Sequence, residues 1–202
     1  MNKTIVFDLG GVLVDWNPRY LYKSVFNDEL KMNHFLSNIC TGNWNELQDA
    51  GRSIQEATDI LVGHFPEHEN HIRMFYGEWK KMLKGPIQGT VDILKSLKNQ
   101  EYRILALTNW SAETYPIALE LFEFLHWFED VLVSGREKLI KPDPAIFNLM
   151  IKRYSLTPSQ TIFIDDNIKN VTVARELGLD GIHFTEPQNL QLQLSERGIG
   201  NW

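Results

Sequence analysis

Five short apolar runs, each closed by polar residues or glycine, constrain the fold of this chain more than any other feature of its sequence. They occupy residues 4–7, 103–107, 130–133, 161–164 and 181–184. Unbroken apolar runs of this length are typical of strands buried on both faces of a parallel sheet. Between the later runs, apolar residues recur every three or four positions, which predicts helices. The alternation predicts an α/β protein with a doubly wound parallel sheet.

Residues 17–84 interrupt this alternation, because they show helical spacing throughout. We expect loops at 41–43 and 63–66 to interrupt the helices. A segment of this length is too long for a simple connection between two strands. We therefore predict an inserted all-helical domain at 17–84, with 1–16 and 85–202 forming the sheet domain and Gly85-Pro86 marking the return.

Composition and charge exclude several classes of protein. The 202 residues carry 20 Lys and Arg against 26 Asp and Glu, a net charge of −6, which argues against a nucleic-acid partner. The single cysteine, Cys40, suits a reducing compartment. The sequence shows neither a signal peptide nor an apolar stretch of roughly 20 residues, so no membrane partner is expected. We expect a cytoplasmic protein that folds as a monomer, with a dimer as the alternative.

Polar residues stand at or after the carboxyl ends of four of the predicted strands. These ends lie at one edge of a parallel sheet, where ligands bind. Any one such residue could simply cap the following helix, but their joint placement favours a site. The set comprises Asp8, Thr108, Asn109, Lys141, Asp165 and Asp166.

The chemistry of this set points to phosphate. Asp8, Asp165 and Asp166 would repel one another without a cation, and their oxygen ligands suit Mg²⁺. A carboxylate can attack phosphorus only when the phosphoryl charge is neutralised. Mg²⁺ and Lys141 would neutralise that charge, while the Thr108 hydroxyl would orient the phosphoryl oxygens.

The segments that carry these residues resemble the four motifs of the haloacid dehalogenase superfamily, in order: residues 7–13, 107–109, 141–143 and 164–167. The helical insert after the first motif is similar to the C1-type cap of that superfamily. Within it, the first motif resembles that of small phosphatases, including glucose-1-phosphate phosphatase-like proteins. The resemblance implies a Rossmann-like core with a cap domain.

For the reaction, the resemblance implies that Asp8 is the nucleophile and forms an aspartyl-phosphate that water hydrolyses. It also implies that Mg²⁺ is held by Asp8, by the backbone carbonyl of Gly10, and by Asp165 or Asp166. Which of these two aspartates contacts the metal directly stays open at this point.

For the substrate, the resemblance implies a small phosphorylated metabolite, with a sugar phosphate among the candidates. Thr108 and Asn109 would bind its phosphoryl group. Lys141 would bind the same group and act in catalysis by stabilising its charge.

One position departs from the pattern of the phosphatases. The residue two after the nucleophile is normally a second aspartate that acts as general acid and base, and here it is Gly10. Such assistance is worth about 10²–10⁴-fold in rate. We therefore expect substrates with good leaving groups, such as anomeric sugar phosphates, acyl phosphates or aryl phosphates. Glu46 and Asp49 of the insert are candidates for a substitute acid.

Two other functions stay open. If Gly10 in place of the second aspartate disables catalysis, the chain could be a weakly active regulatory protein that binds a phosphometabolite. A 2-haloacid dehalogenase would use Asp8 to attack carbon, which needs no metal, but the retained pair Asp165 and Asp166 favours phosphorus.

Trp16 and Trp110 follow the first two motifs and are expected to wall a pocket. Three further tryptophans are expected to pack in the core: Trp44, Trp79 and Trp127.

Overall fold

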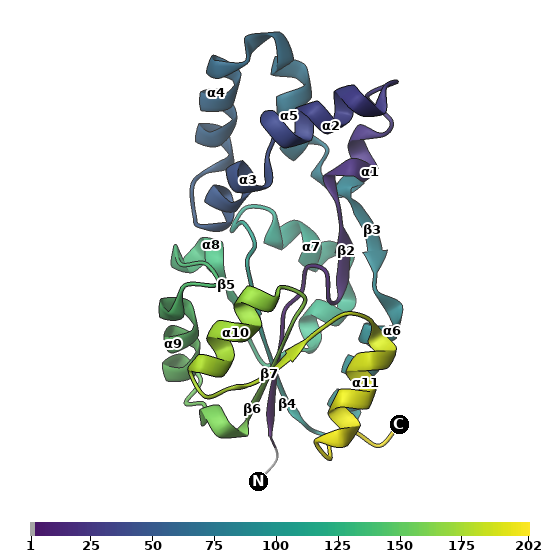
Figure 1. Ribbon diagram of the computed structural model, residues 1–202, viewed down its shortest axis with the longest axis vertical. Helices are drawn as coiled ribbons and strands as arrows, with labels where there is room; N and C mark the ends of the chain where they lie inside the picture. The colour runs from purple at the N-terminus through teal and green to yellow at the C-terminus, as the bar shows by residue number, and fades with distance from the viewer. Residues whose placement is uncertain (1–2) are drawn as a thin grey trace.

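The computed structural model describes residues 3–202, and a five-stranded parallel sheet lies at its centre (Figure 1). The strand order is β5-β4-β1-β6-β7. This arrangement confirms the predicted α/β fold, and each strand begins and ends within one residue of its predicted run. The strands are β1 (Thr4–Phe7), β4 (Arg103–Thr108), β5 (Val131–Val133), β6 (Thr161–Asp165) and β7 (Asp180–His183).

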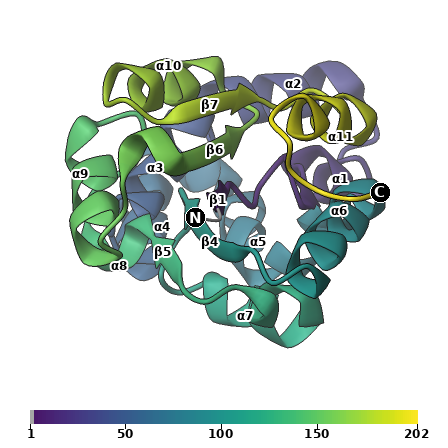
Figure 2. The same ribbon diagram turned by 90° about the horizontal axis from the view of Figure 1, so that it is seen from below.

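Helices cover both faces of this sheet (Figure 2). In β1, β4, β5 and β6, alternate apolar residues belong to opposite cores. In β1, Ile5 and Phe7 belong to one apolar core and Val6 to the other. Burying each such side chain contributes about 1.5–3 kcal/mol. One core includes side chains of α6 (Gln88–Asn99), α7 (Tyr115–Leu121) and α11 (Pro187–Glu196). The other includes side chains of α9 (Pro144–Arg153) and α10 (Ile168–Glu176).

Five α-helices and two 3₁₀ turns between β2 and β3 gather beyond the carboxyl ends of the strands, and we call them the helical body (Figure 1). An antiparallel ribbon of β2 (Val14–Trp16) and β3 (Leu83–Pro86) joins it to the sheet. Its interior is aromatic, with the rings of Tyr22 and Phe35 centred 5.0 Å apart. The five helices are α1 (Pro18–Tyr22), α2 (Glu29–Asn38), α3 (Gly42–Asp49), α4 (Ile54–His64) and α5 (Glu69–Gly77).

The structure differs from the sequence prediction at three points of this body. Of the loop predicted at 63–66, only Phe65 lies outside helical structure, because α4 continues to His64 and a 3₁₀ turn begins at Pro66. A loop was predicted at 41–43, but only Thr41 lies outside α3, because its hydroxyl accepts a hydrogen bond from Trp44 N at 3.1 Å and caps the helix. Such a cap stabilises a helix by about 1 kcal/mol. Helical spacing was predicted up to residue 84, but α5 ends at Gly77 and gives way to a 3₁₀ turn over Trp79–Met82 and then to β3.

The remaining short helix, α8 (Ser134–Glu137), follows β5. It contacts the helical body, since Ser134 Oγ donates to the Asp49 carbonyl at 2.6 Å. Among residues 3–202, no helix has both the length and the apolar character that a bilayer crossing requires.

Candidate active site

Asp8 directly follows β1 and lies at the carboxyl edge of the sheet. Its backbone N–H continues the sheet by donating to the Ile164 carbonyl at 2.8 Å, and its Oδ1 accepts from Leu9 N at 2.7 Å. The side chain is buried, with Asp8 only 8% exposed. The chain then turns tightly, and Gly11 adopts a φ of 71°, which a residue with a side chain rarely adopts. Asp8 is therefore a fixed, nearly buried carboxylate at the start of a turn.

Lys141 joins Asp8 to the end of β6. Its Nζ lies 2.9 Å from Asp8 Oδ2 and 2.7 Å from Asp165 Oδ2, and it also donates to the Leu107 carbonyl at 2.9 Å. The residue is 2% exposed. Burial alone would lower the pKa of Lys141, but the two carboxylates outweigh this effect and the pKa is raised. The ammonium group is therefore charged and shared between two aspartates.

Asp165 and Asp166 have different surroundings. Asp165 is fully buried, and its Oδ1 accepts from Asn167 N at 2.8 Å and from Asn170 Nδ2 at 3.0 Å. Asp166 is exposed, and its carboxylate lies against the turn after β1. A Cβ on Gly11 would clash with the Asp166 carboxylate, so the Asp166 side chain can keep this position only beside a glycine. Asp165 is held in place by protein groups, whereas Asp166 faces outward.

The three carboxylates converge, because one oxygen from each of Asp8, Asp165 and Asp166 lies within 4.8 Å of the others. One ammonium group balances three potential negative charges. Burial raises the pKa of Asp8 to about 8; the nearby Lys141 opposes this, and Asp165 adds to it. A divalent cation would lower that pKa by favouring the charged form. An all-oxygen donor set of this kind fits Mg²⁺.

Thr108 is the last residue of β4, and Asn109 directly follows it. The Thr108 hydroxyl is fully buried and has no hydrogen-bond partner among the described residues, which fits a hydroxyl that binds a phosphoryl oxygen. The Asn109 side chain donates to the Lys141 carbonyl at 2.9 Å and accepts from Lys141 N at 2.8 Å. Asn109 therefore positions Lys141, a role that the sequence did not suggest; its contact with a phosphoryl group stays a prediction.

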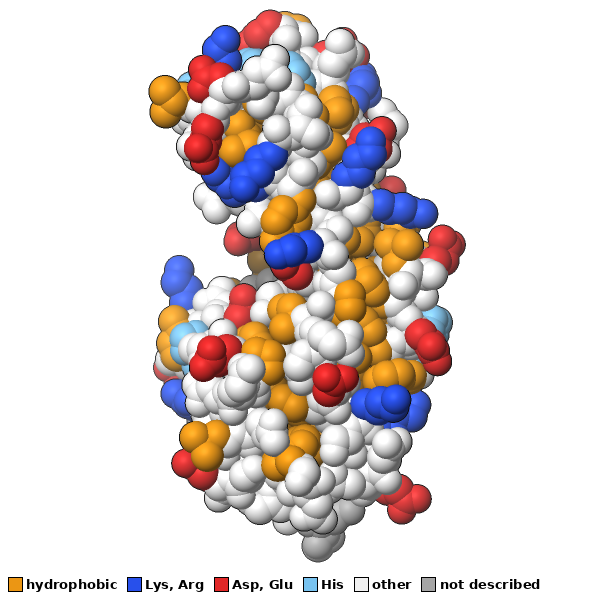
Figure 3. Space-filling model, turned by 90° about the vertical axis from the view of Figure 1, so that its right-hand side faces the viewer, with side chains coloured by type: hydrophobic (Ala, Val, Ile, Leu, Met, Phe, Trp, Pro, Cys, Tyr) orange, Lys and Arg blue, Asp and Glu red, His pale blue; other side chains and the backbone are white. Residues whose placement is uncertain are grey.

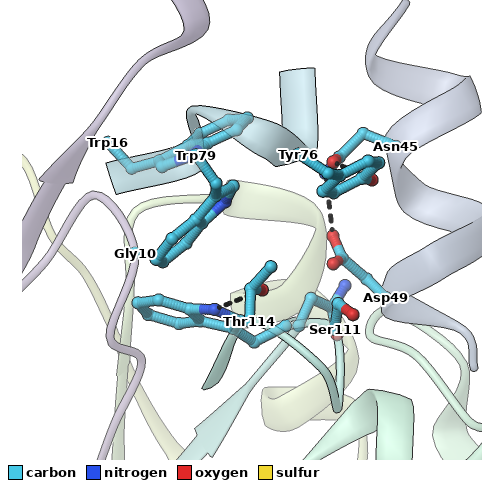
Figure 4. Close-up of a pocket in the computed structure, with 10 residues that line it drawn as sticks. Gly10, Trp16, Asn45, Asp49, Tyr76, Trp79, Ser111 and Thr114 are labelled. Carbon is cyan, nitrogen blue, oxygen red and sulfur yellow. Dashed lines mark hydrogen bonds between the residues drawn. The ribbon is translucent and has the colours of Figure 1, made fainter. Parts of the chain in front are cut away.

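A cavity of about 130 Å³ adjoins this cluster, between the helical body and the sheet (Figure 4). In the space-filling view the molecule is hollowed between its two parts (Figure 3). Trp16 and Trp110 line the cavity, which confirms the prediction that they wall a pocket. Trp79, predicted to pack in the core, is buried but lines it as well. Nothing in the sequence distinguishes Trp79 from the packing tryptophans.

Of the two acidic candidates in the helical body, only one reaches this cavity. Asp49, the last residue of α3, lines it. Glu46 lies one turn earlier on the same helix and is exposed. Asn45 and Tyr76 also line the cavity, although the sequence offered no signal for either.

A family model described as haloacid dehalogenase-like hydrolase matches residues 5–184, from β1 to the end of β7. The chain belongs to this family. The matched range contains all of the site residues.

Curated relatives over most of the chain include two phosphatases. The sesquiterpene phosphatase astK of Aspergillus oryzae is 23% identical over 184 residues, covering 91% of this chain and 90% of the relative. The D-ribitol-5-phosphate phosphatase of Bacteroides thetaiotaomicron is 24% identical over 201 residues, covering 94% and 93%. Other relatives are longer proteins, of which the chain spans 38%, 46% and 6%.

Among solved structures, a haloacid dehalogenase family enzyme of Bacteroides thetaiotaomicron in complex with magnesium and inorganic phosphate is similar to this chain. It superposes with a TM-score of 0.67 at 23% identity, covering 92% of this chain and 96% of that one. Dehalogenase structures share the fold too, with TM-scores of 0.61 to 0.67. The fold alone therefore does not separate phosphate chemistry from dehalogenation.

Proposed function

We propose that this hydrolase is a Mg²⁺-dependent phosphatase that acts on a small phosphate monoester through an aspartyl-phosphate. The observation that carries the proposal is the cluster of Asp8, Asp165 and Asp166 around the buried Lys141, beside the unpartnered Thr108 hydroxyl. Relatives named as phosphatases support it. The retained acidic pair weighs against dehalogenation, because attack on carbon has no need for metal ligands.

Each residue of the cluster has a role in this proposal. Asp8 attacks the phosphorus atom, the bond between phosphorus and the alcohol oxygen breaks, and the alcohol leaves as its anion and takes a proton from water. Lys141 and the Thr108 hydroxyl hold the phosphoryl oxygens, and Lys141 stabilises the charge that develops on them. Water then attacks the phosphorus of the aspartyl-phosphate, which releases inorganic phosphate and restores the Asp8 carboxylate.

The outward-facing Asp166, Asp8 and the Gly10 carbonyl would hold the cation. A Mg²⁺ ion held by these groups would neutralise phosphoryl charge and would keep Asp8 ionised. Both oxygens of Asp165 already accept hydrogen bonds, so we assign Asp165 to holding Lys141. Asp166 is accordingly the direct ligand of the pair.

We further propose that residues 17–84 act as a C1-type cap on a core formed by 1–16 and 85–202. A cap over the reaction centre excludes water and shapes the pocket for the alcohol part of the ester. Anomeric sugar phosphates, which are expected because no general acid stands at Gly10, are among the candidates.

Removal of the metal tests the proposal. The protein is expected to hydrolyse a generic aryl phosphate with Mg²⁺, and treatment with a chelator should lower the rate by about 100-fold or more, because several kcal/mol of charge stabilisation are lost. Adding Mg²⁺ back should restore the rate. Hydrolysis that persists unchanged in the chelator would contradict the proposal, and halide release from a 2-haloacid would replace it with dehalogenation.

The absence of a proton donor at Gly10 favours a second candidate, a phosphometabolite-binding protein with little turnover. Tight binding of phosphate esters, without metal-dependent hydrolysis of even an activated ester, would select this function. Measurable turnover of the aryl phosphate rejects it.

The missing donor also gives a prediction about leaving groups. A Cβ on Gly10 would meet nothing within 4 Å, so an aspartate has room at its first atom. Gly10→Asp is expected to raise kcat for a primary alkyl phosphate by about 10-fold or more, and to change aryl phosphate hydrolysis little, because a phenolate needs no proton to leave. Gly10→Asn, of the same size but without an acid, should give no gain. Equal turnover of alkyl and aryl phosphates by the unaltered protein would contradict the premise.

A further inference from the structure

The cavity beside the reaction centre is placed to receive the alcohol part of a phosphate ester. Gly10 and Asn109, which follow β1 and β4, line it on the side of the site. Asn45 and Asp49 of the helical body line it on the opposite side (Figure 4). An ester with its phosphorus at Asp8 would therefore extend its alcohol part into this cavity.

The walls between these two sides are aromatic. Trp79 and Trp110 come from the helical body and the sheet domain, and their rings are centred 5.8 Å apart. The indole N–H of Trp110 donates to Thr114 Oγ1 at 3.1 Å, which fixes the orientation of that ring. Aromatic faces bind apolar groups and cations, because their surfaces are apolar and carry partial negative charge.

Asp49 is the charged side chain of this cavity: none of the other described residues that line it is acidic or basic. Its carboxylate lies at the C-terminus of α3, where the helix dipole disfavours negative charge. Asn45 Nδ2 donates to Asp49 Oδ2 at 3.2 Å. Burial raises the pKa of Asp49 to about 7; a backbone hydrogen bond from Ser111 opposes this, and Glu46 adds to it.

No lysine or arginine among the described residues lines the cavity to offset this charge. Arg52 lies nearby on the chain, but its guanidinium donates to Gln48 Oε1 at 2.9 Å and does not line the cavity. A carboxylate or second phosphate on the alcohol part would lose water without gaining a countercharge, and would face Asp49.

From this geometry we propose that the phosphatase acts on monoesters whose alcohol part packs against tryptophan faces and ends in a neutral hydrogen-bond donor or a cation. Asp49 accepts from that donor group and excludes esters with a second anion. The inference rests on the phosphatase function proposed above and names the substrate class of that same site.

The test uses the aryl phosphates of tyrosol, tyramine and phloretic acid. They carry a hydroxyl, an ammonium and a carboxylate on the same two-carbon side chain, and the group that leaves from phosphorus is a similar phenol in each. At a pH above the Asp49 pKa of about 7, kcat/KM for the hydroxyl and ammonium esters should exceed that for the carboxylate ester by about 10-fold or more.

Two variants on one helix locate the effect. Asp49→Asn should raise kcat/KM for the carboxylate ester, lower it for the ammonium ester and change the hydroxyl ester least. Glu46→Gln removes the same charge from the exposed side of α3 and should keep the original ranking. A merely structural role for Asp49 would instead lower all three values together.

The outcomes separate the two proposals. If the unaltered protein hydrolyses the three esters equally well, or if a folded Asp49→Asn variant keeps the original ranking, the inference is wrong and the phosphatase function stands. If a generic aryl phosphate is hydrolysed with Mg²⁺ but none of the three esters is, the inference is wrong and the phosphatase function stands. If the generic aryl phosphate is not hydrolysed either, the proposed function itself is wrong and the inference falls with it. Should Asp49→Asn fail to fold, the ranking by the unaltered protein decides alone.

Discussion

Replacing Asp8 by asparagine is expected to lower kcat for every phosphate ester by about 10⁴-fold or more, which is the scale seen when a nucleophile is removed. The amide is nearly the same size as the carboxylate but cannot attack phosphorus. The fold should survive, because Lys141 keeps its 2.7 Å contact with Asp165. Steady-state hydrolysis of an aryl phosphate and a thermal denaturation curve measure both effects.

Mass spectrometry of acid-quenched protein gives a second readout of the same change. During turnover the unaltered protein should carry one added phosphoryl group on the peptide that contains Asp8, and Asp8→Asn should carry none. Asp92→Asn, which alters an exposed carboxylate on α6, should keep both the adduct and the rate. An adduct that persists in Asp8→Asn would place the nucleophile elsewhere.

The centre of this site could be predicted from sequence for a physical reason. In a parallel sheet the carboxyl ends of neighbouring strands meet, so residues far apart in the chain, such as Asp8 and Asp165, come together once the strands are recognised. The strands were recognisable because both faces are buried, which requires unbroken apolar runs. The meeting of strand ends does not by itself predict the position of Lys141, because this residue lies beyond α8. It reaches the carboxylates from a loop whose backbone is hydrogen-bonded to Asn109.

The pocket could not be predicted in the same way. Asp49 and Trp79 reach it from the helical body, and their position depends on how that body packs on the sheet. The contact between Ser134 Oγ and the Asp49 carbonyl, which ties α3 to the core, joins residues 85 positions apart and has no local signal. The spacing of apolar residues identifies a helix and its apolar face but not the orientation of that helix relative to a separate domain. Trp79 was therefore predicted only to pack in the core.

Replacing Lys141 by methionine is expected to destabilise the protein by about 3–5 kcal/mol, because it leaves two buried carboxylates without their partner. Asp8 and Asp165 lie 2.9 and 2.7 Å from the ammonium that would be lost. The free energy of unfolding from urea titration measures the change. Lys152→Met, on the exposed side of α9, should change it by less than about 0.5 kcal/mol.

The double variant Lys141→Met with Asp8→Asn separates charge balance from packing. If the ammonium serves to neutralise Asp8, removing the Asp8 charge should recover part of the lost stability, whereas the rate should stay as low as in Asp8→Asn alone. Added Mg²⁺ should stabilise the single variant Lys141→Met as well, since a second source of positive charge then faces the same carboxylates. Additive losses in the double variant, together with no stabilisation by Mg²⁺, would mean that Lys141 contributes through its methylene packing and that the three aspartates do not share a cation.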